Sequence, residues 1–178
     1  MTHQELLELL HHAETVSGTA TLTETEGNPT LCEVTVEGIP DNSIFYPKID
    51  KARFNNFLRD GLGHDKHGDH MLITKDGIFV FEMKSKMEVN DNLVEECRKK
   101  FTSDTCMMAY VDKIFDSIVG QGEFFSTHKI CFVLLYQATD IAIAGVGINP
   151  YVKVDMFHKR GVPNKGKIQY NSLITLLQ

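Results

Sequence analysis

Two carboxylates and a lysine are the residues of this 178-residue chain whose types and spacing best suit chemistry: Asp69, Glu82 and Lys84. Asp69 directly precedes one short apolar segment, residues 70–74, and Glu82 lies near the end of a second, residues 78–83, which Lys84 follows. Carboxylates held close together repel each other, and a divalent cation relieves that repulsion. Bound Mg²⁺ polarises a phosphoryl oxygen and activates water, and an ammonium group beside it stabilises charge on phosphorus. The three residues are therefore candidates for metal-dependent phosphodiester chemistry.

The segments around these residues predict a β-hairpin. Asp76-Gly77 lies between them, and Asp-Gly is a preferred two-residue type I′ turn. With that turn as the loop, Asp69 pairs directly with Lys84 and lies diagonal to Glu82 on one face. Diagonal neighbours lie about 7–8 Å apart at Cα, so the two carboxylates could share one cation. His70 is expected on the opposite, apolar face, because side chains alternate along a strand.

An ordinary structural role is the alternative for the same residues. Asp69 and Lys84 could form an exposed cross-strand ion pair, which contributes only about 0–1 kcal/mol, and Glu82 could be an exposed strand glutamate. Charged groups that interrupt strands apolar on both faces are costly to bury. That cost favours a chemical role.

The length of the chain predicts a single domain, and the pattern of apolar residues predicts the elements around the hairpin. The expected elements are a helix at 3–16, two strands within 19–37, a turn at 38–42, a short strand at 44–49, a helix at 51–59, a polar loop at 61–68, a long helix at 90–118, a buried strand at 128–137, a strand at 151–157 and final helical turns at 171–178.

Composition narrows the class of protein. The net charge of −6 argues against a non-specific nucleic-acid coat, and no apolar run reaches the roughly 18–20 residues that span a bilayer. No signal peptide is recognisable. The four cysteines form no C-x-x-C pair and are expected to be reduced, mostly buried thiols. A cytoplasmic protein with no membrane partner is the expectation.

The motif resembles a known family signature. Gly68-Asp69 followed by Glu82-Met83-Lys84 resembles the signature of the PD-(D/E)-x-K nuclease superfamily, and so does the element order of residues 48–137. The resemblance implies a restriction-endonuclease-like α/β core with a mixed central sheet flanked by helices. It also implies cleavage of nucleic acid with Mg²⁺ or Mn²⁺, commonly in restriction, repair or antiviral defence. Asp69, Glu82 and the backbone carbonyl of Met83 would then ligate the metal, and Lys84 would act on the attacking water.

The chain also departs from the family pattern. Gly68 replaces the proline of the motif, and neither Asp50 nor Asp60 clearly matches the acid that many members carry on their first helix. The helix after the motif offers Glu96, Lys99 and Lys100, and no glutamine, where some members have a glutamine. Residues 1–47, an N-terminal extension of helix and strands, and residues 138–178, C-terminal strands with a basic segment, lie outside the resemblance.

Five basic residues are predicted to contact nucleic acid: Lys86, Lys99, Lys100, Lys159 and Arg160. A solvated helix face would explain Lys99 and Lys100 equally well, and a surface loop would explain Lys159 and Arg160.

Histidines ahead of the hairpin offer a different metal site. His64, His67 and His70 form H-x-x-H-x-x-H, and zinc commonly takes imidazole ligands. A polar loop is the alternative explanation for His64 and His67, and either of these could carry a proton near neutral pH.

The leading hypothesis is a metal-dependent nuclease that acts on nucleic acid, with DNA as the expected substrate. The alternative is a catalytically inactive member of the same fold that serves as a binding subunit of a larger nucleic-acid-processing or defence complex. A protein partner or a second copy of the chain is compatible with either hypothesis.

Overall fold

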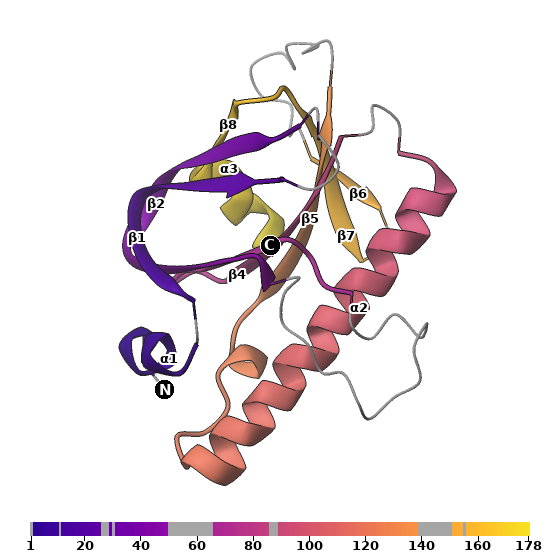
Figure 1. Cartoon of the computed structure of the whole chain (residues 1–178). Helices are drawn as coiled ribbons and strands as arrows, with labels where there is room; N and C mark the ends of the chain where they lie inside the picture. The colour runs from indigo at the N-terminus through magenta and orange to yellow at the C-terminus, as the bar shows by residue number, and fades with distance from the viewer. Residues whose placement is uncertain are drawn as a thin grey trace.

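The computed structural model of this chain describes residues 2–10, 12–25, 29, 31–49, 66–85, 89–138, 151–154 and 156–178. These residues form a mixed eight-stranded β-sheet with helices packed on it (Figure 1). The predicted α/β class with a mixed sheet flanked by helices is confirmed. No helix in the described part of the chain is long and apolar enough to cross a membrane.

The strands follow the order β1-β2-β3-β4-β5-β7-β6, and β8 pairs with β2. The β4–β5, β5–β7 and β2–β8 pairs are parallel, and the other pairs are antiparallel. The strands are β1 (Glu14–Thr23), β2 (Glu33–Pro47), β3 (His70–Ile73), β4 (Ile78–Lys84), β5 (Ile130–Gln137), β6 (Val152–Val154), β7 (Phe157–Val162) and β8 (Gly166–Gln169).

The helices are α1 (His3–Leu9), α2 (Asp91–Ile114), α3 (Tyr170–Ile174) and three short segments, η2 (Phe115–Val119), η3 (Phe125–Thr127) and η4 (Thr175–Leu177). Helix α2 begins where the Asn90 side chain accepts the N–H of Leu93. Near its end, the buried Asp112 carboxylate accepts three N–H groups of residues 124–126. These hydrogen bonds fix the end of α2 against residues 124–126, which precede β5.

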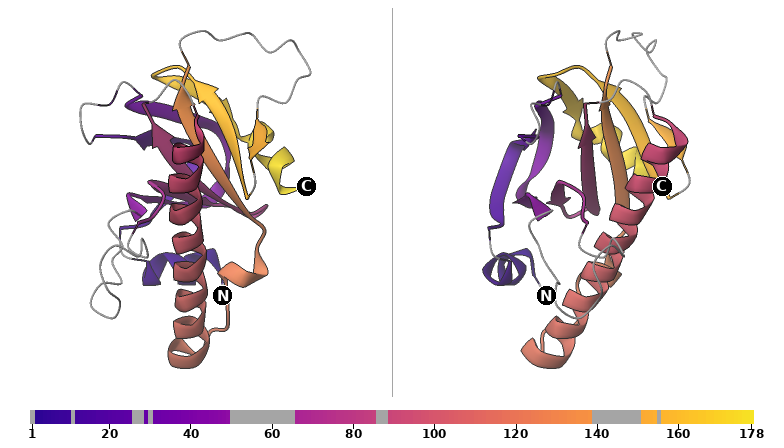
Figure 2. Two further views of the ribbon diagram at one scale, coloured as in Figure 1. Left: turned by 90° about the vertical axis from the view of Figure 1, so that its right-hand side faces the viewer. Right: turned by 45° about the vertical axis from the view of Figure 1, so that its right-hand side comes forward.

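Two hydrophobic cores lie on the two faces of β4 and β5. One core lies beneath α2 and includes Val80, Phe101 and Leu134. The other includes Phe81 and Leu173, and joins β1, β2, β8 and α3. Figure 2 shows α2 running along one side of the sheet. Helix α3 packs in the core on the other face. A strand residue that faces α2 therefore belongs to the first core and its neighbours in the chain to the second.

Several predicted boundaries are wrong. The first helix ends at Leu9, because residues 14–23 form β1. Strand β2 runs through residues 38–42, where a turn was expected, because it stays paired with β1 on both sides of an irregularity in the register, with Gly38 and Asn42 at positive φ. Lys159 and Arg160 lie in β7 and not in a loop.

Some predictions fall outside the described residues, namely the helix at 51–59, Asp50, Asp60, His64 and Lys86. The four cysteines are free thiols; Cys97 and Cys131 are buried, whereas Cys106 is exposed, contrary to expectation.

Candidate metal-binding and catalytic site

The hairpin has a register different from the predicted one. Ile73 pairs with Ile78 and His70 with Phe81, so the two-residue loop is Lys75-Asp76, closed by Thr74 N–H donating to the Gly77 carbonyl at 3.0 Å. The loop lies one residue earlier than the predicted Asp76-Gly77, so each cross-strand pairing shifts by two residues. A shift of two residues keeps each side chain on its predicted face, because strand side chains alternate with a period of two.

Contacts with the C-terminal end of the chain select this loop. The Thr74 hydroxyl accepts the N–H groups of Asp76 and Gly77 and is hydrogen-bonded to the Tyr170 hydroxyl at 2.7 Å. Tyr170 also donates to the Asp76 carboxylate. Gly77 does not have the positive φ that a type I′ turn requires. It is needed for space, because a Cβ there would lie 2.9 Å from the backbone carbonyl oxygen of Lys129 and 2.7 Å from a methyl group of Leu177.

Asp69 lies beside residues 81–83 of β4 and not opposite Lys84. The Asp69 N–H donates to the Phe81 carbonyl at 2.7 Å, and its carboxylate accepts the N–H of Met83 at 2.6 Å. The prediction that Asp69 faces Lys84 directly is therefore wrong.

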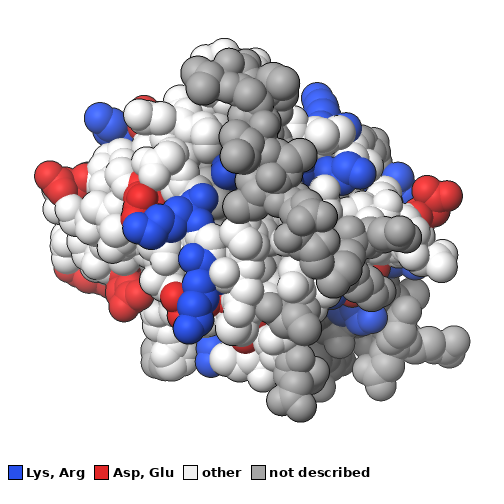
Figure 3. Space-filling model, turned by 90° about the horizontal axis from the view of Figure 1, so that it is seen from above, with Lys and Arg blue, Asp and Glu red and all other residues white. Residues whose placement is uncertain are grey.

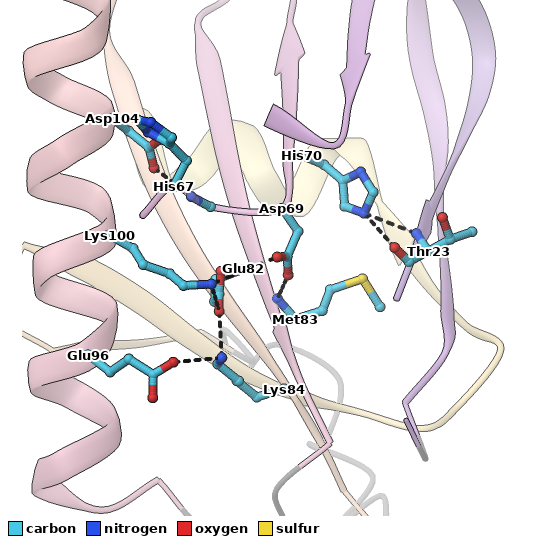
Figure 4. A network of polar contacts seen from close by, with 11 residues as sticks. Thr23, His67, Asp69, His70, Glu82, Met83, Lys84, Glu96, Lys100 and Asp104 are labelled. Atoms are coloured by element: carbon cyan, nitrogen blue, oxygen red, sulfur yellow. Dashed lines mark hydrogen bonds and ion pairs between the residues drawn. The ribbon is translucent and has the colours of Figure 1, made fainter. Parts of the chain in front are cut away.

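Glu82 is the centre of a polar cluster beneath α2 (Figure 4). Its side chain is fully buried, and Oε1 accepts from Lys100 Nζ at 2.7 Å and from Lys84 Nζ at 2.9 Å. Lys100 Nζ also lies 4.0 Å from the nearer oxygen of Asp69. Lys84 donates in addition to Glu96 Oε1 at 2.8 Å. The cluster therefore contains three acids and two lysines.

Helix α2 supplies Glu96 and Lys100 of this cluster and, one turn further on, Asp104. Glu96, Lys100 and Asp104 follow one another at intervals of four residues, which places them on one face of a helix. Lys100 was predicted as a nucleic-acid contact and the other two had no assigned role. The four-residue row of charged side chains beside an apolar stripe was the sequence signal that could have revealed them.

The donor set fits a hard divalent cation. Among the described residues, Glu82 Oε2 is buried and has no hydrogen-bond partner, a state that costs free energy unless a cation or water satisfies it. The described residues contain no group of three or more His, Cys, Asp or Glu arranged to hold a metal. Asp69 and Glu82 would hold an ion as a pair, with carbonyl or water oxygens completing the shell. The role of the Met83 carbonyl as a metal ligand stays a prediction.

Burial sets the charge states of the cluster. Burial and the nearby Glu82 raise the pKa of Asp69 to about 8, although Lys100 and the Met83 N–H oppose the shift. Burial also raises the pKa of Glu82, against the two lysines. Burial alone would lower the pKa of Lys84 and Lys100, but their acidic neighbours, Glu82 first, raise it above the usual value. Both lysines are therefore charged near neutral pH.

No family model, curated protein or solved structure matches this chain. Its function has to be argued from the site itself.

A second buried contact holds the segment ahead of Asp69 against α2. His67 Nδ1 lies 2.9 Å from one oxygen of Asp104, whose other oxygen accepts the Gly68 N–H at 3.0 Å. A Cβ at Gly68 would lie 2.9 Å from Val80 Cγ1. Proline, the usual residue of the motif, would remove this N–H and meet the same obstacle. Glycine at position 68 is thus explained by packing.

The proposed histidine zinc site is not formed by the described residues. His67 is buried against α2, whereas His70 faces the opposite side, where Nε2 contacts the backbone of Thr23 and the ring stacks on Phe45. The two imidazoles therefore cannot ligate one ion. The interpretation of His67 as a residue of a polar surface loop is also wrong, because its side chain is fully buried.

Among the described residues, the other predicted nucleic-acid contacts, Lys99, Lys159 and Arg160, form no ion pair with Asp69 or Glu82. Lys99 is exposed and lies 3.8 Å from Glu95. Arg160 donates to the Tyr151 hydroxyl and covers its ring. Lys159 is half-buried in β7, in the same row of the sheet as Glu82. Figure 3 shows the basic side chains visible on the upper face interspersed with acidic ones.

The raised pKa of Asp69 predicts that the metal-free protein loses stability as the pH rises from about 4 to about 8. In this range the folded protein retains a proton that the unfolded chain releases, so the unfolding free energy falls with increasing pH. The loss should be on the order of a few kcal/mol. Urea unfolding with a chelator present, at about pH 4, 6 and 8, measures it.

Asp69→Asn is the matched control for this pH dependence, because it keeps the shape of the side chain and removes its titration. The variant should lose less stability over the same pH range. An identical slope in the two proteins would contradict the prediction.

Proposed function

We propose that this chain is a metal-dependent nuclease with a restriction-endonuclease-like core, acting on DNA with Mg²⁺ or Mn²⁺. One observation carries the proposal: Asp69 and Glu82 lie in one buried cluster in which Lys84 contacts Glu82 at 2.9 Å. The cluster leaves Glu82 Oε2 unsatisfied among the described residues. A cytoplasmic role in restriction or antiviral defence belongs to the same proposal and rests on the motif resemblance.

Each side chain has a distinct task in this proposal. Asp69 and Glu82 hold the ion, and the Met83 N–H orients the Asp69 carboxylate by its hydrogen bond. When bound there, the ion supplies Lewis-acid stabilisation of a phosphoryl oxygen and activates a water. Lys84 remains protonated because its acidic neighbours raise its pKa against the effect of burial. It therefore orients the water and stabilises phosphate charge by donating hydrogen bonds, and does not act as the base.

A second candidate function is a catalytically inactive binding subunit. The observation that favours it is the Lys100 ammonium, which contacts Glu82 and lies 4.0 Å from Asp69, so that an internal cation already partly neutralises the two acids. Such a cluster could be purely structural.

Cleavage assays separate the two candidates. The protein is incubated with supercoiled plasmid, single-stranded DNA or RNA in the presence of Mg²⁺, Mn²⁺ or a chelator. Metal-dependent cleavage that is lost in both Asp69→Ala and Glu82→Ala supports the nuclease. Glu37→Ala is the matched control, since Glu37 pairs with Lys167 outside the cluster. Cleavage that survives both cluster substitutions would refute the assignment, and no cleavage of any substrate would favour the inactive subunit.

A further inference from the structure

Lys100 occupies the position from which an ammonium can neutralise both carboxylates of the site. Its Nζ lies 2.7 Å from Glu82 Oε1 and 4.0 Å from the nearer oxygen of Asp69, and its side chain is only 15% exposed. Figure 4 shows it reaching from α2 toward the hairpin. The buried Glu82 carboxylate needs such a counter-charge when no metal is bound, because unpaired buried charges are strongly unfavourable.

The surrounding structure holds Lys100 in this position. Cys97 and Phe101 on the same helix are fully buried in the core beneath α2. One turn further on, Asp104 accepts the Gly68 N–H at 3.0 Å and thereby joins α2 to the segment that carries Asp69. The helix backbone is therefore fixed relative to the acids. Only rotation of the Lys100 side chain can take its ammonium away from them.

Lys84 differs from Lys100 in its acidic partners. Lys84 is shared between Glu82 and Glu96, at 2.9 and 2.8 Å, so it retains an acidic partner if the Glu82 contact is lost. Within the described residues, the carboxylates that form ion pairs with Lys100, at up to 4.0 Å, are Glu82 and Asp69, which are also the two assigned to the metal. A divalent cation on that pair would meet the Lys100 ammonium at short range, and like charges in a buried cluster repel.

We infer that Lys100 is a tethered cation that pairs with Glu82 beside Asp69 in the metal-free protein and competes with the divalent ion for these two side chains. The inference rests on the proposed function, because it assigns Lys100 a role toward the same metal. Lys100 is a positioning and regulating residue of the cluster in this account. It sets the metal concentration at which the site fills.

Mn²⁺ binding to the full-length chain, measured by isothermal titration calorimetry, tests the inference without reference to activity. Lys100→Met keeps the length of the side chain and removes its charge. It should bind Mn²⁺ at least about tenfold more tightly than the wild-type protein, a difference of about 1.4 kcal/mol. Lys99→Met is the matched control. Lys99 is the neighbour of Lys100 on the same helix, is 62% exposed and pairs with Glu95, so the Lys99→Met protein should bind Mn²⁺ with the wild-type affinity.

Lys100→Gln provides a second variant, because it keeps a hydrogen-bond donor beside Glu82 and also lacks the charge. It should show the same tightening, and it replaces Lys100→Met if that variant does not fold. Wild-type and Lys100 variants that bind Mn²⁺ equally well would overturn the inference and leave the nuclease proposal intact. Absence of Mn²⁺ binding by all of these proteins would overturn both.

Discussion

Glu82→Gln is expected to reduce metal-dependent cleavage by at least about 10²–10³-fold, the range associated with loss of one key electrostatic group in an active site. The amide keeps the shape of the side chain but cannot provide the negative charge that the metal and both lysines share. Initial cleavage rates at a fixed Mn²⁺ concentration measure the effect. Glu37→Gln is the matched control, because Glu37 pairs with Lys167 and Gln169 outside the cluster.

The same substitution is expected to destabilise the fold. Glu82 is fully buried with Lys84 and Lys100 on one of its oxygens, and removing one partner of a buried ion pair costs about 3–5 kcal/mol. Urea unfolding at neutral pH measures the loss.

A double variant separates lost chemistry from lost stability. Glu82→Gln combined with Lys100→Met removes charges of both signs, and should recover part of the unfolding free energy without restoring cleavage. A Glu82→Gln protein that cleaves at a rate within about threefold of wild type would exclude a role for the Glu82 charge in catalysis.

Asp104→Ala is expected to have the second large effect. The Asp104 carboxylate contacts His67 at 2.9 Å and the Gly68 N–H at 3.0 Å. The side chains of Asp104 and His67 are fully buried. Its loss leaves two buried polar partners without their acceptor, which costs about 1–3 kcal/mol for each group. Urea unfolding should therefore show a destabilisation of about 3 kcal/mol.

Asp104→Ala should also slow cleavage, although the residue touches neither metal nor substrate in our proposal. It joins α2 to the segment that ends in Asp69, and small misplacements of reacting groups reduce rates up to about 10²-fold. We expect the cleavage rate at saturating Mn²⁺ to fall by about tenfold or more. Asp104→Asn, which keeps one acceptor oxygen, should recover part of the rate.

The exposed Asp116, in the same part of the chain but outside the cluster, supplies the control substitution Asp116→Ala. If Asp104→Ala lowers stability but cleaves at the wild-type rate under conditions where it is folded, Asp104 has a structural role alone.

Local patterns in the sequence were sufficient to bring the acids together. Alternation along residues 69–84 placed Asp69, Glu82 and Lys84 on one face and His70 on the other, and the contacts of the structure agree. The apolar stripe of residues 90–118 and the continuous apolar run of residues 128–137 likewise predicted helix α2 and the buried strand β5. These features depend on the fixed side-chain periods of strands and helices. Such periods can be recognised within a short stretch of sequence.

Only the tertiary structure decided the register of the hairpin and the partners of the acids. Gly77 is selected by contacts with Leu177 and the loop by Tyr170, nearly one hundred residues further along the chain. The choice of Lys100 over the adjacent Lys99 depends on how α2 is rotated against the sheet. Asp69, Glu82 and Lys84 were thus predictable as a set, because alternation is local. Their distances and counter-charges were not, because distant segments supply them.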